Sequence, residues 1–253
     1  MTATTARAMT AELDDPTQRL RTITSVFAAP VAHGDIEIDV TVARRGRTMS
    51  QLSATTKNSG AAAGHITVAA FGTDRPGFHF TDRVPPDVPP PEECRNYGDD
   101  VPDDWPAFEP WGFWQQVEGK PALRHPPWED YEPTSALVAQ WFRFVEPARL
   151  DDGRWDPLAL VTMCDVMPGA VDERIGPNRV RFMPPSVDLT VHLFDDARSE
   201  WILGVNRARW AGEGYASGDM ELWDMHSGPP RLVAYGTQIM FFVFPDGLPP
   251  MVS

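Results

Sequence analysis

The sequence predicts an α+β protein in which one unit of helix and antiparallel strands occurs twice. Most segments alternate apolar and polar residues, as half-buried strands do. The ending "AAFGTD" at 69–74 is nearly repeated as "VAYGTQ" at 233–238, and "TSVF" at 24–27 can be laid over "VHLF" at 191–194. Chance similarity between short β-rich segments is the alternative, but the flanking strands follow in matching order, which favours a duplication.

The composition limits the number of domains and the kinds of partner that this protein can have. The chain has 253 residues, 42% of them hydrophobic, enough for one large domain or two fused small ones. A net charge of −14 disfavours nucleic acid and anionic membranes as partners. Cys94 and Cys164 form no disulfide or zinc pattern, and neither a signal peptide nor a long apolar run occurs. We therefore expect a cytoplasmic protein that binds neither nucleic acid nor membrane.

The composition divides the chain into three parts. Residues 1–74 form an N-terminal unit, 75–110 an acidic, proline-rich linker, and 111–253 a C-terminal unit. We expect the linker to pack along the fold, because it carries aromatic residues, among them Phe78, Phe80, Trp105 and Phe108. A proline-rich docking site is the rival interpretation.

Each unit has one predicted helix. In the first unit the helix spans 5–15, and strands follow at 19–30, 35–44, 48–57 and 64–72. In the second, strands at 112–122 and 135–147 precede a helix from Asp156 that Pro168 and Gly169 end. Strands at 186–194, 200–210, 214–224 and 230–244 complete that unit. The second helix is apolar nearly all round, so we expect it to be buried.

An apolar helix followed by long antiparallel strands, present twice across a linker, resembles the double hot-dog arrangement. The sequence resembles the type II acyl-CoA thioesterases, and in particular their actinobacterial thioesterase-like branch. The residues that carry the resemblance are "RPGFHFTDRVPPDVPPPE", "SVDLTVHLF", "GEGYASGDMELWD" and "LVAYGTQIMFF". It implies two antiparallel sheets, each wrapped around a central helix.

The first unit is shorter than this pattern. Far fewer residues precede its first strand than precede Asp188 in the second unit, too few for both a strand and a full helix. Either the start codon is placed late or the first strand has been lost, which leaves a sheet edge for a neighbouring chain or loop to cover.

Strand faces select the candidate site residues. Alternation puts Asp188 on one face of its strand, where an ordinary solvated face is the alternative. On the last strand Ala234, Gly236 and Gln238 share a face, and two small residues followed by an amide leave room for a slender ligand. Close packing against the central helix is the other explanation for Ala234 and Gly236.

The resemblance implies roles for these residues. The family holds a water with an Asp, a Ser or Thr, and a Gln, and these positions carry over to Asp188 as general base and Gln238 as the group that orients the water. The hydroxyl position falls near Arg207, where no Ser or Thr is available. Arg207 is either a surface cation or a partner for Asp188 or a CoA phosphate. In the first unit Asp74 aligns with Gln238, so we expect one site per chain.

Another acidic residue lies inside the apolar helix. Asp165 resembles an Asp of the family's central helix, and for it we favour a structural hydrogen bond over catalysis.

The resulting prediction is hydrolysis of acyl-CoA to CoA and a carboxylic acid, with no metal or redox cofactor. A non-catalytic acyl-CoA binding protein is the main alternative, motivated by the missing hydroxyl. A hydratase would need an Asp/His pair near the start of the helix, and this helix contains no His. A purely structural assembly partner is a further alternative. A homo-oligomer could also form through the hot-dog sheets.

Overall fold

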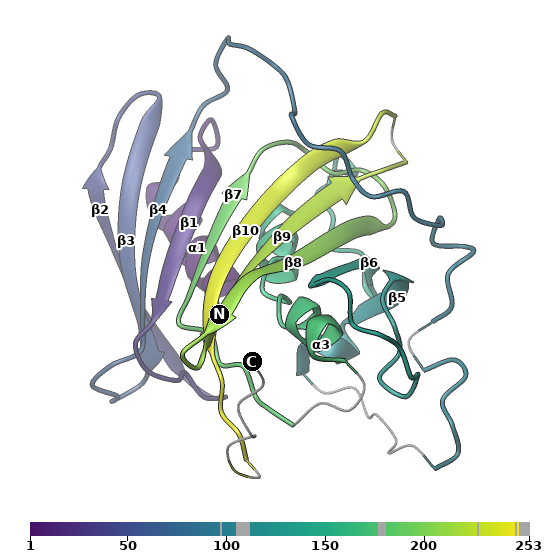
Figure 1. Ribbon diagram of the computed structural model, residues 1–253. Coiled ribbons are helices and arrows are strands. Elements are labelled where there is room, and N and C mark those ends of the chain that lie inside the picture. Colours follow the sequence, from purple (N-terminus) through teal and green to yellow (C-terminus); the bar gives the residue numbers. More distant parts are fainter. Residues whose placement is uncertain (97, 105–111, 177–180, 227, 246, 248–253) are drawn as a thin grey trace.

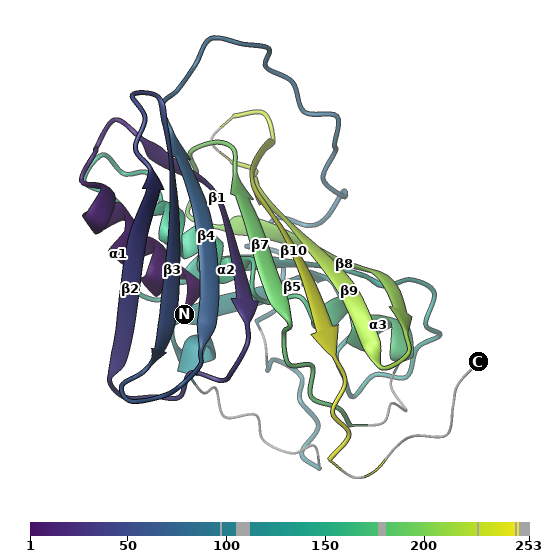
Figure 2. The ribbon, with the colours of Figure 1, turned by 90° about the vertical axis from the view of Figure 1, so that its left-hand side faces the viewer.

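A single antiparallel sheet organises the molecule. The computed structural model describes residues 1–253 except 97, 105–111, 177–180, 227, 246 and 248–253. In this described part, ten strands pair in the order β2-β3-β4-β1-β7-β10-β9-β8-β6-β5. The helices lie against one face, which we name the inner face (Figures 1 and 2). The double hot-dog prediction is confirmed, with one refinement: the two expected sheets join edge to edge.

The N-terminal half contains one helix and four strands. They are α1 (Thr2–Leu13), β1 (Arg19–Phe27), β2 (Ile36–Arg44), β3 (Met49–Asn58) and β4 (His65–Gly72). The helix is complete, and no strand precedes it in the described part of the chain. It ends at Asp14, which adopts a left-handed conformation, and the Arg45 guanidinium donates hydrogen bonds to the carbonyls of Glu12 and Leu13. Arg45 therefore stabilises the negative end of the helix.

The C-terminal half is larger. A short 3-10 helix (Gly112–Gln115) precedes β5 (Val117–Leu123) and β6 (Leu137–Phe144). Next come α2 (Pro157–Met163) and α3 (Gly169–Ile175). Strands β7 (Asp188–Leu193), β8 (Ile202–Gly212), β9 (Tyr215–Asp224) and β10 (Arg231–Phe241) complete it. Because β2 has no neighbour corresponding to β6 and β5, it forms one edge of the sheet, as the missing first strand predicts.

The predicted central helix is broken in two. It begins as expected: the Asp156 carboxylate accepts a hydrogen bond from the Leu158 N–H, and Pro157 occupies the first turn. It ends earlier than predicted, with Cys164 as its C-cap. Pro168, which has no N–H to donate, and Gly169 begin α3 instead of ending α2, because the start of a helix leaves its first N–H groups without intrahelical partners.

The two halves meet at β1 and β7. These strands pair antiparallel with Thr24 opposite Thr190, whose hydroxyls are 3.0 Å apart. The element order α1-β1-β2-β3-β4 matches α2/α3-β7-β8-β9-β10, and the strand order is mirrored about this pair. The structure thus supports a duplication.

The motif alignment that suggested the duplication is nevertheless wrong in register. Gly72 is the last residue of β4 and pairs with Arg19 at the start of β1. Gly236 lies mid-strand in β10 and pairs with Val191. The two motifs therefore lie at different levels of the sheet, and Asp74 is not the counterpart of Gln238.

The linker crosses the outer face of the C-terminal half (Figure 1). There the Trp141 indole N–H donates to the Pro89 carbonyl at 2.9 Å, and Val88 and Cys94 pack on a cluster that includes Trp141. The predicted surface packing applies to this part of the linker. Phe78 and Phe80, in contrast, are exposed, and the predicted contacts of Trp105 and Phe108 lie outside the described residues.

Candidate active site

Gln238 is the centre of a small polar cluster on the inner face. Its strand alternates buried and exposed residues, and Gln238 is only 3% exposed. The side-chain amide donates two hydrogen bonds, one to Asp165 Oδ1 at 2.9 Å and one to Ser186 Oγ at 2.6 Å. An amide N–H2 group has two hydrogens, so both are used. The cluster therefore holds a carboxylate and a hydroxyl in a fixed relation.

Asp165 enters the cluster from the helical side. It follows the C-cap Cys164 directly, so the end of α2 sets its position. Solvent reaches the residue on one side, while protein atoms crowd the carboxylate on the other. This loss of hydration raises the pKa of Asp165, and the hydrogen bond from Gln238 partly opposes the rise. The carboxylate is a stronger base than that of a free aspartate.

Ser186 places a hydroxyl beside Gln238, on a different segment from the one where a hydroxyl was expected. It lies two residues before Asp188 and forms a bridge with Met240 of β10, which brings its hydroxyl beside Gln238. The expected position of the hydroxyl lay on the strand around Arg207. The available signal was Ser186 itself, the first residue of the quoted segment "SVDLTVHLF".

Small residues allow the helix to approach the sheet. A Cβ atom at position 236 would lie 2.9 Å from the Cys164 Cβ and 3.0 Å from the Met167 Cε. Ala234 on the same face is fully buried. Of the two explanations for Ala234 and Gly236, close packing against the central helix agrees with these contacts, and the structure shows no room for a ligand at Gly236. Their indirect role is to bring Asp165 within reach of Gln238.

Asp188 and Gln238 line the same pocket of about 230 Å³, but no hydrogen bond joins their side chains in the described part of the chain. Asp188 belongs to the face opposite Leu189 and Val191, which are buried against the helices. Its carboxylate accepts a hydrogen bond from the Ile239 N–H at 2.8 Å. The carboxylate that accepts a hydrogen bond from Gln238 is that of Asp165, and the role of Asp188 as general base stays a prediction.

Two polar residues of β8 have other surroundings. Arg207 pairs with Asp219 in the strand ladder and, within the described part of the chain, forms no ion pair with Asp188. Asn206 is 2% exposed; its carbonyl accepts from the Ala170 N–H and its amide donates to the Asp219 carbonyl, both at 2.9 Å. Asn206 thus holds the first turn of α3 against the sheet.

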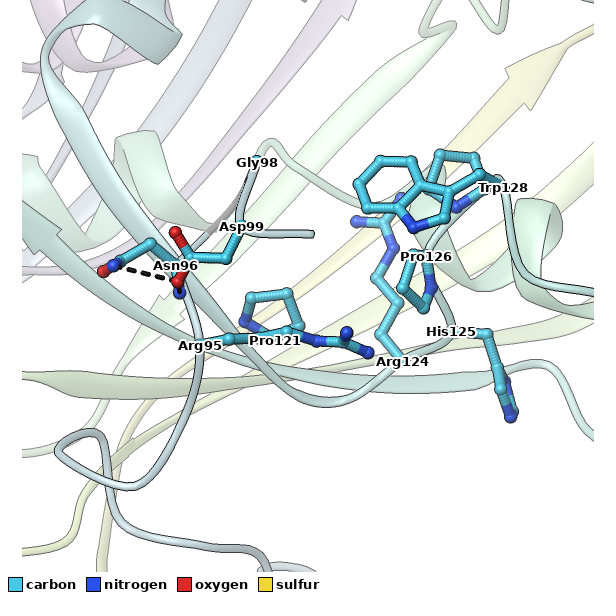
Figure 3. A pocket seen from close by; sticks show the side chains of 10 residues that line it. Arg95, Asn96, Gly98, Asp99, Pro121, Arg124, His125, Pro126 and Trp128 are labelled. Carbon is cyan, nitrogen blue, oxygen red and sulfur yellow. Dashed lines mark hydrogen bonds between the residues drawn. The ribbon is translucent and has the colours of Figure 1, made fainter. Parts of the chain in front are cut away.

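A pocket lined by basic residues lies away from this cluster (Figure 3). Its lining includes Arg95, Arg124, His125 and Trp128. Arg95 already pairs with Glu129 at 3.1 Å. The pocket is small, and one of its guanidinium groups is already paired, so it offers little as a substrate site.

Further side chains bear on the class of site. Among the described residues, no three His, Cys, Asp or Glu side chains group so as to hold a metal ion. The thiol of Cys164 is fully buried, which raises its pKa and makes it a poor nucleophile. Within the same residues, no helix is long and apolar enough to cross a membrane.

Comparisons with known proteins place this geometry in context. The family model for the acyl-CoA thioesterase C-terminal domain matches residues 91–242, and that for the N-terminal domain matches residues 1–73. Curated proteins gave no match.

Solved structures share the fold over nearly the whole chain. A conserved protein of unknown function with a hot-dog fold from Alicyclobacillus acidocaldarius is 25% identical with a TM-score of 0.77, over 96% of this chain and 86% of that one. The acyl-CoA thioesterase II TesB2 from Mycobacterium marinum is 19% identical with a TM-score of 0.73, over 97% and 88%. These likenesses support the double hot-dog architecture.

Proposed function

Because the chain belongs to the acyl-CoA thioesterase family, we propose that it hydrolyses acyl-CoA thioesters at the cluster of Asp165, Ser186 and Gln238. The observation that carries this proposal is the pair of hydrogen bonds from the Gln238 amide to Asp165 Oδ1 and Ser186 Oγ. A carboxylate, a hydroxyl and an amide converge there on the solvent-accessible side of the helix end.

The geometry supports a water-activating role for these groups. Asp165 accepts a proton from the attacking water, and its raised pKa makes this transfer more favourable. Gln238 fixes the carboxylate, and the Ser186 hydroxyl, which accepts from Gln238, keeps its own hydrogen to donate. The hydroxide adds to the thioester carbonyl, the C–S bond breaks, and the proton passes to the CoA thiolate. The products are a carboxylic acid and free CoA.

The surroundings of Ser186 suit an acyl chain. Ser186 bridges to Met240, and the rings of Phe182 and Phe242 pack edge to face with centroids 5.2 Å apart in the same segment. Both aromatic rings pack against the main hydrophobic core. An apolar chain placed here would leave water while its carbonyl stays beside the polar cluster.

The oxyanion donor stays a prediction. We expected a backbone N–H at a helix N-terminus, but at the start of α2 the Leu158 N–H is taken by Asp156. That end is also a full helix length from Asp165, which follows the other end of α2.

The test is free-thiol release from short to long acyl-CoAs. We expect Asp165→Asn and Gln238→Ala to lower kcat by about 100-fold or more, the usual effect of losing general-base catalysis. Ser186→Ala should lower it less, since it removes a positioning group. The discriminating variant is Asp188→Asn, for which this proposal expects turnover within about threefold of wild type, because the Asp188 carboxylate is not hydrogen-bonded to Gln238.

Two outcomes would contradict the proposal. If Asp188→Asn abolished turnover while Asp165→Asn did not, the base would be the aspartate on the outer face. If a folded wild-type protein released no thiol from any acyl-CoA but gained thermal stability from it, the non-catalytic binding protein would be the correct alternative. Ser186 places a hydroxyl beside Gln238, while the hydroxyl position near Arg207 that motivated this alternative stays unmatched.

A further inference from the structure

The pocket that Asp188 and Gln238 share continues to a second carboxylate, on β9. Its lining includes Asp219, Arg209 and Tyr235, and we name the part of the pocket at these three residues the basin. Asp219 lies on the strand next to Gln238, one position out of register with it, which places the two Cα atoms about 6 Å apart. The basin therefore belongs to the candidate active site, yet no step of the proposed reaction uses its side chains.

Two irregularities in the strand ladder shape this part of the sheet. Between β8 and β9 the register shifts at Arg209, which is an extra residue on β8. Between β7 and β10 three residues, 187–189, face two, 238–239. A bulge of this kind turns a side chain from its regular direction and is frequent beside active sites. These two bulges place Arg209 and Asp188 on the lining of one pocket.

The Asp219 carboxylate is held in place with one oxygen unused. The residue is 3% exposed, and its Oδ2 accepts a hydrogen bond from the Arg209 guanidinium. Its Oδ1 is buried and has no hydrogen-bond partner among the described residues. A buried carboxylate oxygen without a donor is costly. Because Arg209 fixes the orientation of the carboxylate, Oδ1 is a preformed acceptor for an N–H or O–H group of a ligand.

The charges of the basin restrict the kind of donor. The carboxylates of Asp188 and Asp219 outnumber the single guanidinium of Arg209 on the lining of the pocket. Phosphate and carboxylate groups are therefore repelled, whereas a neutral amide is not. The pKa of Tyr235 is raised, chiefly by burial and then by the charge of Asp219, so its hydroxyl stays neutral. A neutral chain that carries an N–H group fits this lining.

An acyl-CoA carries such a group close to its thioester. The first amide nitrogen of the neutral pantetheine arm lies three bonds from the sulfur, or about 4 Å. We propose that the basin receives the pantetheine arm and that the Asp219 Oδ1 accepts a hydrogen bond from its first amide N–H. With the thioester beside Gln238 and the acyl chain beside Ser186, the separation of about 6 Å between Gln238 and Asp219 brings this N–H within reach of Oδ1.

This inference rests on the proposed thioesterase reaction and specifies its substrate class. Asp219 is a specificity-determining residue that selects thioesters of pantetheine. Thioesters of glutathione are rejected, because their carboxylate groups meet the carboxylates of Asp188 and Asp219.

A pair of model substrates tests the contact. S-butanoyl-N-acetylcysteamine contains the first amide, and the butanoyl thioester of 2-mercaptoethyl acetate has an ester oxygen in place of the N–H. We expect the wild-type protein to hydrolyse the amide with a kcat/KM about tenfold higher or more, as one hydrogen bond to a charged group predicts. In Asp219→Asn this preference should disappear, because the Asn oxygen accepts from Arg209 and its NH2 group then faces the N–H of the ligand.

The matched control is Glu221→Gln. Glu221 lies on the same strand and is 2% exposed, but it does not line the pocket, so the variant should keep the wild-type preference for the amide. Equal kcat/KM values for both substrates in the wild-type protein, or an unchanged preference in Asp219→Asn, would overturn the inference and leave the thioesterase reaction intact. If Asp219→Asn instead changed the discrimination between 3-hydroxybutanoyl and butanoyl thioesters, Oδ1 would bind the acyl group, which also overturns it.

Binding of CoA separates this inference from the reaction itself. Calorimetric titration with CoA requires no turnover, and Asp219→Asn should weaken the affinity by about tenfold or more while circular dichroism shows a folded variant. If no thioester were hydrolysed but this loss of affinity were measured, the proposed reaction would be wrong and the basin would still bind pantetheine. If a folded Asp219→Asn variant bound CoA as the wild-type protein does, the contact with Oδ1 would be refuted.

Discussion

Substituting Gly236 by alanine tests how the sheet positions the proposed catalytic carboxylate. The added Cβ would lie 2.9 Å from the Cys164 Cβ, 3.0 Å from the Met167 Cε and 3.3 Å from the Cys164 Sγ. The Met167 methyl is flexible and can turn away. The Cys164 Cβ is fixed to the helix backbone, so α2 itself must move.

The size of this movement follows from the contact distances. Ordinary van der Waals contact begins near 3.4 Å, so the helix end must retreat by about 0.5 Å. Asp165 follows Cys164 directly and would be carried along, which lengthens its 2.9 Å hydrogen bond with Gln238 to about 3.4 Å. Overpacking of this kind costs about 1–3 kcal/mol of unfolding free energy. A misplacement approaching 1 Å can lower turnover by about 100-fold, so we expect a loss of roughly tenfold.

Two assays measure these effects. Thermal unfolding should show Tm lowered by about 2–4 °C per kcal/mol for a chain of this size. Thiol release should show the loss in kcat. Gly218→Ala is the matched control, because its closest contact, with the Met167 Cβ at 3.1 Å, requires a smaller shift, and the other two, at 3.4 Å, are with the flexible ends of Met167 and Met240. If Gly236→Ala kept wild-type Tm and kcat, close packing at this glycine would not position Asp165.

Four further predictions concern pH and stability. Burial lowers the pKa of His65, so the unfolded chain binds a proton more readily than the folded chain. The unfolding free energy should therefore fall as pH drops below about 6.5, and His65→Gln should flatten this slope in urea titrations. Because the Gln238 hydrogen bond lowers the raised pKa of Asp165, Gln238→Ala should move the acid limb of the residual pH–rate profile to higher pH, and an unmoved limb would contradict Asp165 as base. Trp141→Phe removes a hydrogen bond to a linker carbonyl and should cost about 1 kcal/mol and speed proteolysis within the linker, whereas unchanged cleavage would mean that the linker is held otherwise. Asp224 is 1% exposed, and its carboxylate accepts hydrogen bonds from two backbone N–H groups and a guanidinium. Asp224→Ala should therefore lower the unfolding free energy, measured by chemical denaturation, by about 3–5 kcal/mol, and a loss below about 1 kcal/mol would refute this.

Strand positions were predictable because they depend on local sequence. Alternation and turn residues marked all four strands of the first half, and the cap at Asp156 marked the start of α2. The end of that helix was not predictable in the same way. Pro168 and Gly169 are compatible with either a helix end or a helix start, and the choice depends on the contact between Asn206 and the Ala170 N–H.

The site was predictable only in part. Gln238 was identified from its strand face, and Asp165 was noticed as a carboxylate in an apolar helix but assigned a structural role. Ser186 was missed, and Asp188 was assigned a role beside Gln238. Strand alternation tells which residues of one strand share a face, but it does not tell which face of a neighbouring strand lies on the same side.

The sequence by itself determined the fold class, the duplication and one member of the candidate site, because these follow from hydrophobic period, element order and residue type. Only the tertiary structure decided the rest. The register between β7 and β10 sets the Asp188 carboxylate against the Ile239 N–H, and the packing of Cys164 against Gly236 brings Asp165 within hydrogen-bonding distance of Gln238. The bridge to Met240 adds the hydroxyl of Ser186. A one-residue difference in register reverses the face on which a side chain lies, and such a register is fixed by contacts between segments distant in the chain.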